Sequence, residues 1–228
     1  MPDPVVAVYE FRQCTAAACR FRFPLPPAAQ PADRCPRCGQ PTVIAATVTT
    51  ATEAASGATS HHPARVAVLD NVRSVFNVGS IFRCADGAGL TQLYLCGITP
   101  TPDHPKLHKT ALGAEEELAW SYHPNSLDLV LTLRAEGYAL WALEATAAAH
   151  SLFSPQLTLP PRLALIVGNE NAGVDPDLLA LSDQIVAIPM QGSKRSLNVA
   201  IAFGIAAFRL AEMGNSGAVS SGTVSSEQ

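Results

Sequence analysis

The sequence is poor in charged and aromatic side chains. Charged residues make up 15% and aromatic residues 6% of the 228 positions, and the formal net charge at pH 7 is −4. The strongly basic balance that is common among nucleic-acid-binding proteins is therefore absent. Because local fields matter more than net charge, this absence argues only weakly against such a partner.

Long apolar runs are also missing. No stretch approaches the roughly 18 consecutive apolar residues of a membrane span, and residues 1–10 hold acids and prolines instead of a basic start and an apolar run. We therefore expect a cytoplasmic protein with no membrane partner. In that compartment disulfides are rare, and clustered cysteines more often bind metal.

The two common phosphate-binding loops, G-x-G-x-x-G and G-x-x-x-x-G-K-[ST], do not occur. Short apolar runs instead alternate with helical patterns. Strands are predicted at 65–69, 92–96, 119–122, 138–143, 162–167 and 184–188, and helices at about 77–88, 126–136, 175–181 and 196–212. This alternation predicts an α/β fold whose parallel sheet carries helices on both faces.

Composition divides the chain into four regions. Residues 1–45 hold four cysteines and many prolines, and residues 46–62 are small and polar, as in a flexible linker. The α/β pattern occupies residues 63–213, and residues 214–228 form a Gly/Ser-rich tail that we expect to be disordered.

Parallel sheets bind ligands at loops beyond the carboxyl ends of their strands. The first such segment, residues 69–90, contains Asn77 and Arg83. Asn77 is interpreted either as a helix N-cap or as a site residue. Arg83 stands in an otherwise apolar helix, so it needs either a salt-bridge partner or an anion such as phosphate.

Two further segments follow predicted strands. Residues 165–173 (LIVGNENAG) place Glu170 between Gly168 and Gly173, and the alternatives there are a ligand loop or a tight turn with a solvated carboxylate. Residues 188–200 (IPMQGSKRSLNVA) place Ser196 and Asn198 at a predicted helix start, where anions are favoured but where Ser196 could simply cap the helix.

Together these segments resemble the SpoU (TrmH-like) family of RNA 2′-O-ribose methyltransferases, in the SPOUT superfamily. The family's Asn and Arg six residues apart match Asn77 and Arg83, and its G-x-E-x-x-G matches residues 168–173. Its I-P-M…G…S-L-N-V-S matches residues 188–200, except that Ala200 replaces the last Ser. The resemblance covers about residues 64–212 in the correct order.

The resemblance implies a C-terminal deep trefoil knot, an exception to the usual topology rules. It also implies a homodimer that binds S-adenosyl-L-methionine and methylates a ribose 2′-hydroxyl of RNA. The cofactor would be contacted by the backbone around Gly168, Ile188, Met190 and Leu197. The implied catalytic residues are Asn77, Arg83, Glu170, Ser196 and Asn198, with Arg83 reaching a composite site at the dimer interface.

The role of Arg83 is limited by its chemistry, because a guanidinium stays protonated and is a poor general base. We expect it to orient the ribose and to stabilise charge on the 2′-oxygen and the neighbouring phosphate. The sequence does not distinguish rRNA from tRNA; the appended N-terminal region slightly favours rRNA. The alternatives are a catalytically idle SpoU-like RNA-binding module and an α/β enzyme acting on a small molecule.

The first region contains two cysteine pairs, Cys14-x4-Cys19 and Cys35-x2-Cys38. Four thiolates at such spacing are typical of a zinc ribbon with a structural zinc ion, although a metal-free ribbon or free thiols would share the pattern. Residues 1–45 carry five arginines against three acids, interleaved with phenylalanines at 11, 21 and 23. These rings either stack on RNA bases or form the module's own small core.

One further basic segment, residues 104–113, carries His104, Lys106, His108 and Lys109. It is interpreted either as an RNA-backbone contact or as a solvated loop.

Overall fold

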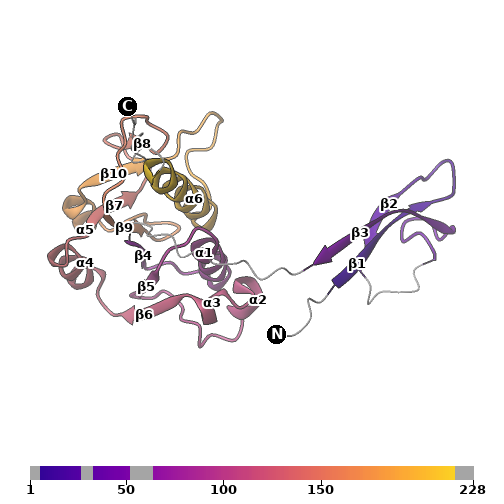
Figure 1. Cartoon of the computed structure of the whole chain (residues 1–228), viewed down its shortest axis with the longest axis horizontal. Coiled ribbons are helices and arrows are strands. Elements are labelled where there is room, and N and C mark those ends of the chain that lie inside the picture. Colours follow the sequence, from indigo (N-terminus) through magenta and orange to yellow (C-terminus); the bar gives the residue numbers. More distant parts are fainter. Residues whose placement is uncertain (1–5, 27–32, 52–63, 219–228) are drawn as a thin grey trace, which may run out of the picture. The chain divides into compact units, whose positions relative to one another are not determined.

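The computed structural model describes residues 6–26, 33–51 and 64–218. Contacts within the chain divide it into two units, Met1–Ser60 and His61–Gln228 (Figure 1). Unit 1 is a three-stranded antiparallel sheet with β1 (Val6–Cys14) between β2 (Arg22–Leu25) and β3 (Thr42–Ala51). β3 carries a bulge opposite Phe11 and Arg12, and the four cysteines lie at one end of this sheet.

Unit 2 is built on a seven-stranded sheet whose paired strands are all parallel. Its order is β6-β5-β4-β9-β7-β10-β8. The strands are β4 (Ala64–Asp70), β5 (Gln92–Cys96), β6 (Ala119–His123), β7 (Ala139–Leu143), β8 (His150–Ser151), β9 (Arg162–Val167) and β10 (Gln184–Ala187). Because β9 lies between β4 and β7, the loops that follow these three strands are neighbours in space although they are distant in sequence.

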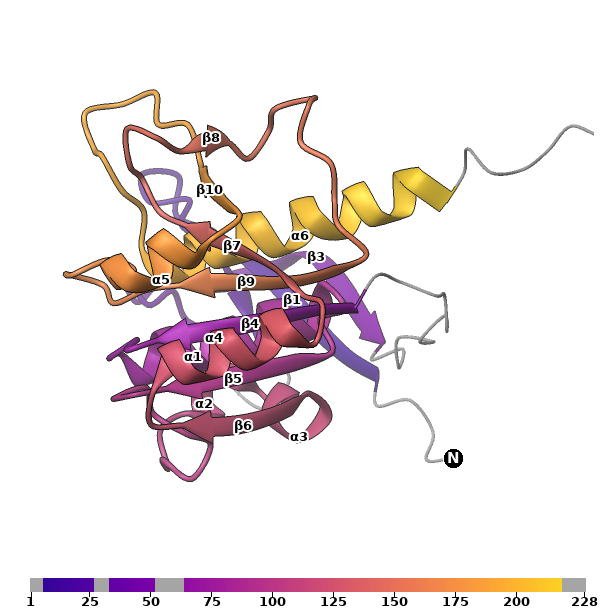
Figure 2. The ribbon, with the colours of Figure 1, turned by 90° about the vertical axis from the view of Figure 1, so that its left-hand side faces the viewer.

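Helices cover both faces of this sheet, as the sequence predicts. They are α1 (Val75–Gly87), α2 (His108–Ala111), α3 (Ala114–Glu117), α4 (Ser126–Ala135), α5 (Pro176–Leu181) and α6 (Val199–Ala218). One core joins α1, α2, α3 and α6 to one face, and a second core joins α4 and α5 to the other (Figure 2). None of the described helices has the length and apolar character that crossing a membrane requires.

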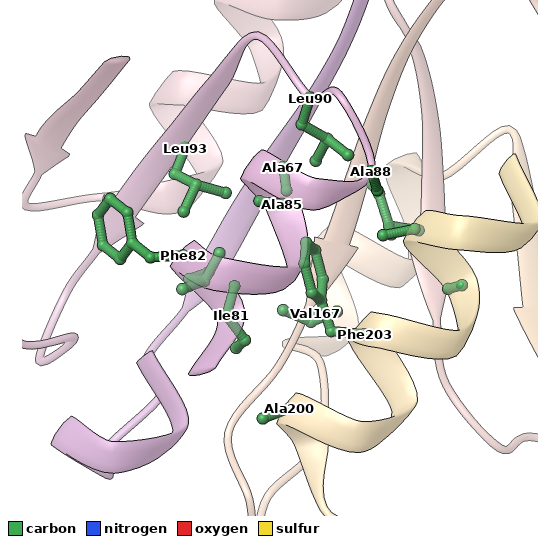
Figure 3. Packing of buried hydrophobic residues seen from close by; sticks show 14 of the residues in the cluster. Ala67, Ile81, Phe82, Ala85, Ala88, Leu90, Leu93, Val167, Ala200 and Phe203 are labelled. Carbon is green, nitrogen blue, oxygen red and sulfur yellow. The ribbon is translucent and has the colours of Figure 1, made fainter. Parts of the chain in front are cut away.

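The central strands alternate between these two cores. In β4, Ala67 and Leu69 belong to the first core, whereas Val66 and Val68 belong to the second. Phe203 of α6 is fully buried in the first core, next to Val167 and close to α1 (Figure 3). Burying such a side chain contributes about 1.5–3 kcal/mol, so the two helices that carry site residues are fixed to the sheet.

Several boundaries differ from the prediction. The linker expected at 46–62 is wrong at its start, because residues 46–51 continue β3 and pair with β1 through Val6↔Ala51. The tail expected at 214–228 is wrong at its start too, because α6 continues to Ala218. The remainder of both predicted regions lies outside the described residues. The sequence also gave no sign of the short elements β8, α2 and α3.

Both helix starts at the site also differ from the prediction. α1 begins at Val75 and is capped by Ser74, whose side chain accepts from the Asn77 backbone N–H, so Asn77 is not the N-cap. α6 begins at Val199, and Asn198 Oδ1 accepts from the N–H groups of Ala200 and Ile201. Asn198 therefore serves the capping role considered for Ser196, and Asp175 caps α5.

Candidate active site

Two adjacent hollows lie where the parallel strands end. The larger is a cleft of about 330 Å³ formed by the segments that follow β7, β9 and β10. The smaller, about 280 Å³, is lined by Arg73, Ser74, Asn77, Glu170 and Asn171, at the ends of β4 and β9. Glu170 and Asn171 line both hollows, so the β9 loop forms the wall between them.

The larger cleft receives all four residues predicted to contact the cofactor: Gly168, Ile188, Met190 and Leu197. Its lining mixes apolar side chains with loop backbone and polar groups such as Glu144 and Ser196. A volume of this size and such a mixed lining are typical of sites for small organic molecules. Ser196 is exposed there.

A hydrogen-bond chain connects three of the predicted catalytic residues. Asn198 Nδ2 donates to Asn77 Oδ1 at 3.0 Å, and Asn77 Nδ2 donates to Glu170 Oε1 at 2.9 Å. Each residue comes from a different strand-end segment, and the bonds span 121 and 93 positions of sequence. Asn77 thus donates to one partner and accepts from the other, a combination that a carboxylate or an aliphatic side chain cannot provide.

Glu170 also accepts from the backbone at the start of α1. The Arg73 N–H donates to Oε2 and the Ser74 N–H donates to Oε1, both at 2.9 Å. Partial burial works against ionisation, but these two N–H groups and the Asn77 amide outweigh it and hold the pKa of Glu170 below its usual range. Glu170 is therefore an ionised anchor for the helix start and is poorly suited to act as a proton donor.

Asn169 and Asn71 connect the loops beneath this chain, and sequence reasoning did not single them out. Asn169 Nδ2 donates to the Asn71 carbonyl at 2.7 Å, and Asn169 Oδ1 accepts from the N–H groups of Asn171 and Ala172. Asn71 adopts a left-handed φ of 57°, which asparagine tolerates better than most residues. An Asn within two residues of the end of each of two neighbouring strands was the available signal.

Asp70 is a third residue that the sequence analysis missed. It is 2% exposed at the end of β4, where Oδ1 accepts from Ser126 Oγ and Asn71 Nδ2, both at 2.8 Å. Burial raises the pKa of the neighbouring Cys96 thiol to about 12, and the negative charge of Asp70 adds to this effect. Cys96 is thus an inert core residue.

Gly173 closes the β9 loop with a φ of 77°. A Cβ there would stand 2.5 Å from Glu144 Oε2, which accepts from the Val174 N–H at 2.9 Å. Backbone conformation and space both require glycine at this position.

Arg83 is not brought to the hollows of this single chain. It lies on α1, exposed, and lines neither the cleft nor the smaller hollow. Six residues of helix rotate it by about 120° from Asn77. Arg83 lies instead one helical turn beyond Gly79. At Gly79, α1 packs so closely on α2 that an added Cβ would lie 2.8 Å from the Leu107 carbonyl oxygen.

The four predicted metal ligands converge in unit 1. The Sγ atoms of Cys14, Cys19, Cys35 and Cys38 all lie within 4.8 Å of one another and could hold a metal ion. The Cys14–Cys38 separation is 3.5 Å and the Cys19–Cys35 separation 3.9 Å, and neither pair is a disulfide. Four sulfurs at 2.3 Å from a tetrahedral zinc would be about 3.8 Å apart, so the arrangement fits that ion.

An α/β domain with an all-parallel sheet and a ligand-sized cleft at the strand ends belongs to the class of small-molecule-binding α/β domains. Within that class, the model of the SpoU rRNA Methylase family matches residues 64–208. The chain therefore belongs to the SpoU rRNA Methylase family.

Known relatives agree with this assignment. The chain is 32% identical over 149 residues to the 23S rRNA (guanosine-2'-O-)-methyltransferase RlmB of Vibrio parahaemolyticus, covering 65% of this chain and 59% of the relative. It is 28% identical over 146 residues to the tRNA (guanosine(18)-2'-O)-methyltransferase of Thermus thermophilus, covering 64% of this chain and 73% of the relative.

A solved structure shares the fold. The AdoMet-bound rRNA methyltransferase of Sinorhizobium meliloti superposes with a TM-score of 0.61 and 29% identity, over 66% of this chain and 58% of that chain. The match thus spans less than two thirds of the Vibrio and Sinorhizobium proteins.

Proposed function

We propose that this protein transfers a methyl group from S-adenosyl-L-methionine to a ribose 2′-hydroxyl of RNA. The observation that carries the proposal is the hydrogen-bond chain from Glu170 through Asn77 to Asn198, which lies between two adjacent hollows. One hollow is sized for a methyl donor and the other is a polar recess beside it. The names of the rRNA and tRNA relatives support the reaction class.

The larger cleft would hold the donor. Gly168 and Leu197 lie on its walls, Ile188 and Met190 follow β10, and the polar lining includes Glu144 and Ser196. When bound, the donor supplies an electrophilic methyl group on a sulfonium sulfur. The protein's contribution is to exclude water from the cleft and to hold the ribose oxygen in line with that methyl group.

The smaller hollow would hold the ribose. Its lining residues Arg73 and Asn77 offer donors to ribose and phosphate oxygens, and the Glu170 carboxylate is fixed by three hydrogen bonds. Transfer would form a C–O bond as the donor's S–C bond breaks to leave a neutral thioether, and the 2′-hydroxyl proton would pass to solvent water. Arg83 stays protonated, so its part is to stabilise the developing charge on oxygen.

Arg83 would act in the site of the partner subunit. Within one chain it lies outside both hollows, while the implied chemistry requires it near the ribose. A symmetric homodimer, in which α1 of one subunit faces the hollow of the other, reconciles the two. Mixing Arg83→Ala with Asn198→Ala chains, each inactive alone, should restore activity at about a quarter of all sites.

The strand order supports a C-terminal knot. The chain leaves β7, forms edge strand β8, returns to the centre as β9, and inserts β10 between β7 and β8 before α6. The segments after β7, β9 and β10 then line one cleft. We propose that the segment leading into α6 passes through the loop formed by the preceding strands, so that the knot builds the donor site.

Charge placement supports RNA as the partner. Ten lysines and arginines lie in the described residues of unit 2, and eight of them form no ion pair there. Of these eight, Arg65 and Arg162 lie at the starts of β4 and β9, and Arg83 lies on α1. The other five lie in segments that follow strand ends: Arg73, Lys106, Lys109, Lys194 and Arg195. Cations gathered at one edge suit a phosphate backbone despite the net charge of −4. The appended unit 1 leads us to favour rRNA over tRNA.

Unit 1 is proposed to be a zinc ribbon. A structural zinc ion held by its four thiolates would tie β1 to the two cysteine turns. Few side chains of this unit are buried, namely Cys14, Leu25, Cys35 and Thr42 among those described. A module with so little core depends on its metal for stability.

The reaction is tested by incubating labelled S-adenosylmethionine with total RNA from cells that lack this gene. Wild type should produce labelled 2′-O-methyl nucleotides, and Arg83→Ala should not. Arg134→Ala should behave as wild type, because Arg134 lies on α4 and forms an ion pair with Asp183. The size of the labelled RNA names the substrate class. Donor binding without labelled RNA would refute turnover and leave an idle RNA-binding module.

A further inference from the structure

The three-stranded sheet of unit 1 has two unequal faces. Alternation along β1 and its pairing place Cys14, Leu25 and Thr42 on one face, and all three are buried. Arg12 lies on this face too, bonded to Glu10 and Thr42. This buried face holds the module's small core, while Val8 and Ile44 on the same face are 43% and 52% exposed.

The opposite face, here called the open face, contains no buried residue. Its members are Tyr9, Phe11, Gln13, Arg22, Pro24, Val43, Ala46 and Val48. Tyr9 is 37%, Val43 52% and Val48 45% exposed. No helix of the described part of unit 1 covers either face.

Two aromatic rings stand in sequence on the central strand of the open face. Tyr9 lies opposite Val48, and Phe11 lies between Pro24 and Ala46. Side chains two residues apart on one strand are about 6.8 Å apart. That spacing presents two neighbouring rings to successive unstacked bases, and small sheets elsewhere bind RNA by such stacking.

The charge of the open face matches the same ligand. Arg22 lies at its end, in register with Gln13, and no acidic residue belongs to the face. The two acids among the described residues of unit 1 are elsewhere: Glu10 is on the buried face and bonded to Arg12, and Asp33 lies outside the strands. Exposed Arg20 and Arg37 add positive charge at the cysteine turns.

We propose that the open face binds single-stranded RNA by stacking bases on Tyr9 and Phe11, with Arg22 contacting the backbone. A duplex cannot occupy it in this way, because its bases are already stacked on one another. The inference rests on the proposed function for its choice of RNA as ligand. It adds that the substrate carries an unpaired segment which unit 1 recognises while unit 2 acts elsewhere on the same RNA.

The test uses the full-length, zinc-loaded chain carrying Tyr9→Trp and an unstructured oligouridine. Emission of the new tryptophan, after subtraction of the wild-type signal, should be quenched by the single strand and not by a matched RNA duplex. Tyr9→Leu should weaken single-strand binding about 5- to 150-fold, the range for loss of one stacked base. Ile44→Ala, which trims an exposed aliphatic side chain on the other face, should change affinity less than twofold.

Equal affinity of wild type and Tyr9→Leu for the oligouridine would overturn the proposal. It would also be overturned if Tyr9→Leu altered the oligomeric state instead, because the face would then contact protein. No donor is present in these measurements, so a failure of methyl transfer leaves them interpretable. Tyr9→Leu must retain wild-type affinity for S-adenosylmethionine, which shows that unit 2 is intact.

Discussion

Asn198 donates a hydrogen bond from Nδ2 to Oδ1 of Asn77 at 3.0 Å, although 121 residues of sequence separate them. The bond connects the first turn of α1 to the start of α6, because Asn198 Oδ1 also accepts from the Ala200 N–H. Asn77 passes the connection on to Glu170. One asparagine therefore holds together the three strand-end segments that the sequence marks separately.

Asn77→Asp should disrupt this hydrogen-bond chain in two ways, by removing a donor and by adding a negative charge. The variant loses the donor to Glu170 and places a second carboxylate 2.9 Å from the first. We expect a loss of about 1–3 kcal/mol in the free energy of unfolding and at least a tenfold loss of methyl transfer. Urea denaturation and labelled-donor assays measure both. Ser80→Ala, one turn away, changes only an exposed bond to the Phe76 carbonyl and should leave both nearly unchanged.

Glu170→Gln should change how stability depends on pH. The folded-state pKa of Glu170 is lowered, so its ionised form stabilises the fold above the unfolded value of about 4.3. That contribution is lost as pH falls through the folded-state pKa. Wild type should therefore exceed Glu170→Gln in thermal midpoint at pH 7, and the gap should narrow below about pH 4.3.

The control for that experiment is Glu116→Gln, since Glu116 is exposed and its side chain makes no hydrogen bond among the described residues. Its gap to wild type should be small at both pH values. A gap for Glu170→Gln that is the same at both pH values would show that the charge of Glu170 does not anchor the start of α1.

Gly173→Ala should weaken donor binding more than it affects RNA affinity. The added Cβ meets Glu144 Oε2 at 2.5 Å in a backbone with φ of 77°, so the β9 loop must shift where it lines the cleft. A left-handed alanine costs about 1 kcal/mol before any clash. Titration calorimetry with S-adenosylmethionine should show at least a fivefold loss of affinity. Gly192→Ala, whose Cβ would meet nothing within 4 Å, is the matched substitution.

Much of the fold of unit 2 could be predicted from the sequence, because buried parallel strands are short apolar runs that recur between helices. Strands such as β5 and β9 match the predicted limits. The short elements α2 and β8 could not be predicted, since four or two residues carry no periodicity.

The connections within the site were harder to predict than its members. Glu170 and Asn198 were found by pattern, but the order of their bonds depends on β9 lying next to β4, which is a tertiary property. Asn169 was passed over because its neighbour Glu170 carried the motif. Strand β3 was missed for a simpler reason: its residues 46–51 have the small, polar composition of a linker, and pairing with β1 decides their conformation.

Removal of metal should unfold unit 1 and spare unit 2. We expect one zinc ion per chain by elemental analysis, and none after Cys35→Ala, because three remaining thiolates hold zinc poorly. Cys84→Ala, which alters a half-buried thiol on α1, should retain one zinc ion. Affinity for S-adenosylmethionine should be the same in all three proteins. A metal-free wild type that resists proteolysis within residues 6–51 would contradict the structural role of zinc.

Asn169→Asp isolates the bond between the β4 and β9 loops. The aspartate keeps an acceptor for the Asn171 and Ala172 N–H groups but cannot donate to the Asn71 carbonyl, which Asn169 Nδ2 approaches at 2.7 Å. A carboxylate facing that carbonyl should cost about 1–3 kcal/mol in the free energy of unfolding. The displaced loop carries Glu170 and lines the donor cleft, so kcat should fall and the KM for donor should rise. Asn125→Asp is the matched control, because Asn125 only accepts, from Leu127 and Asp128 at the start of α4, and aspartate caps a helix equally well. If the two variants unfold at the same urea concentration, the Asn169–Asn71 bond does not hold the loops together.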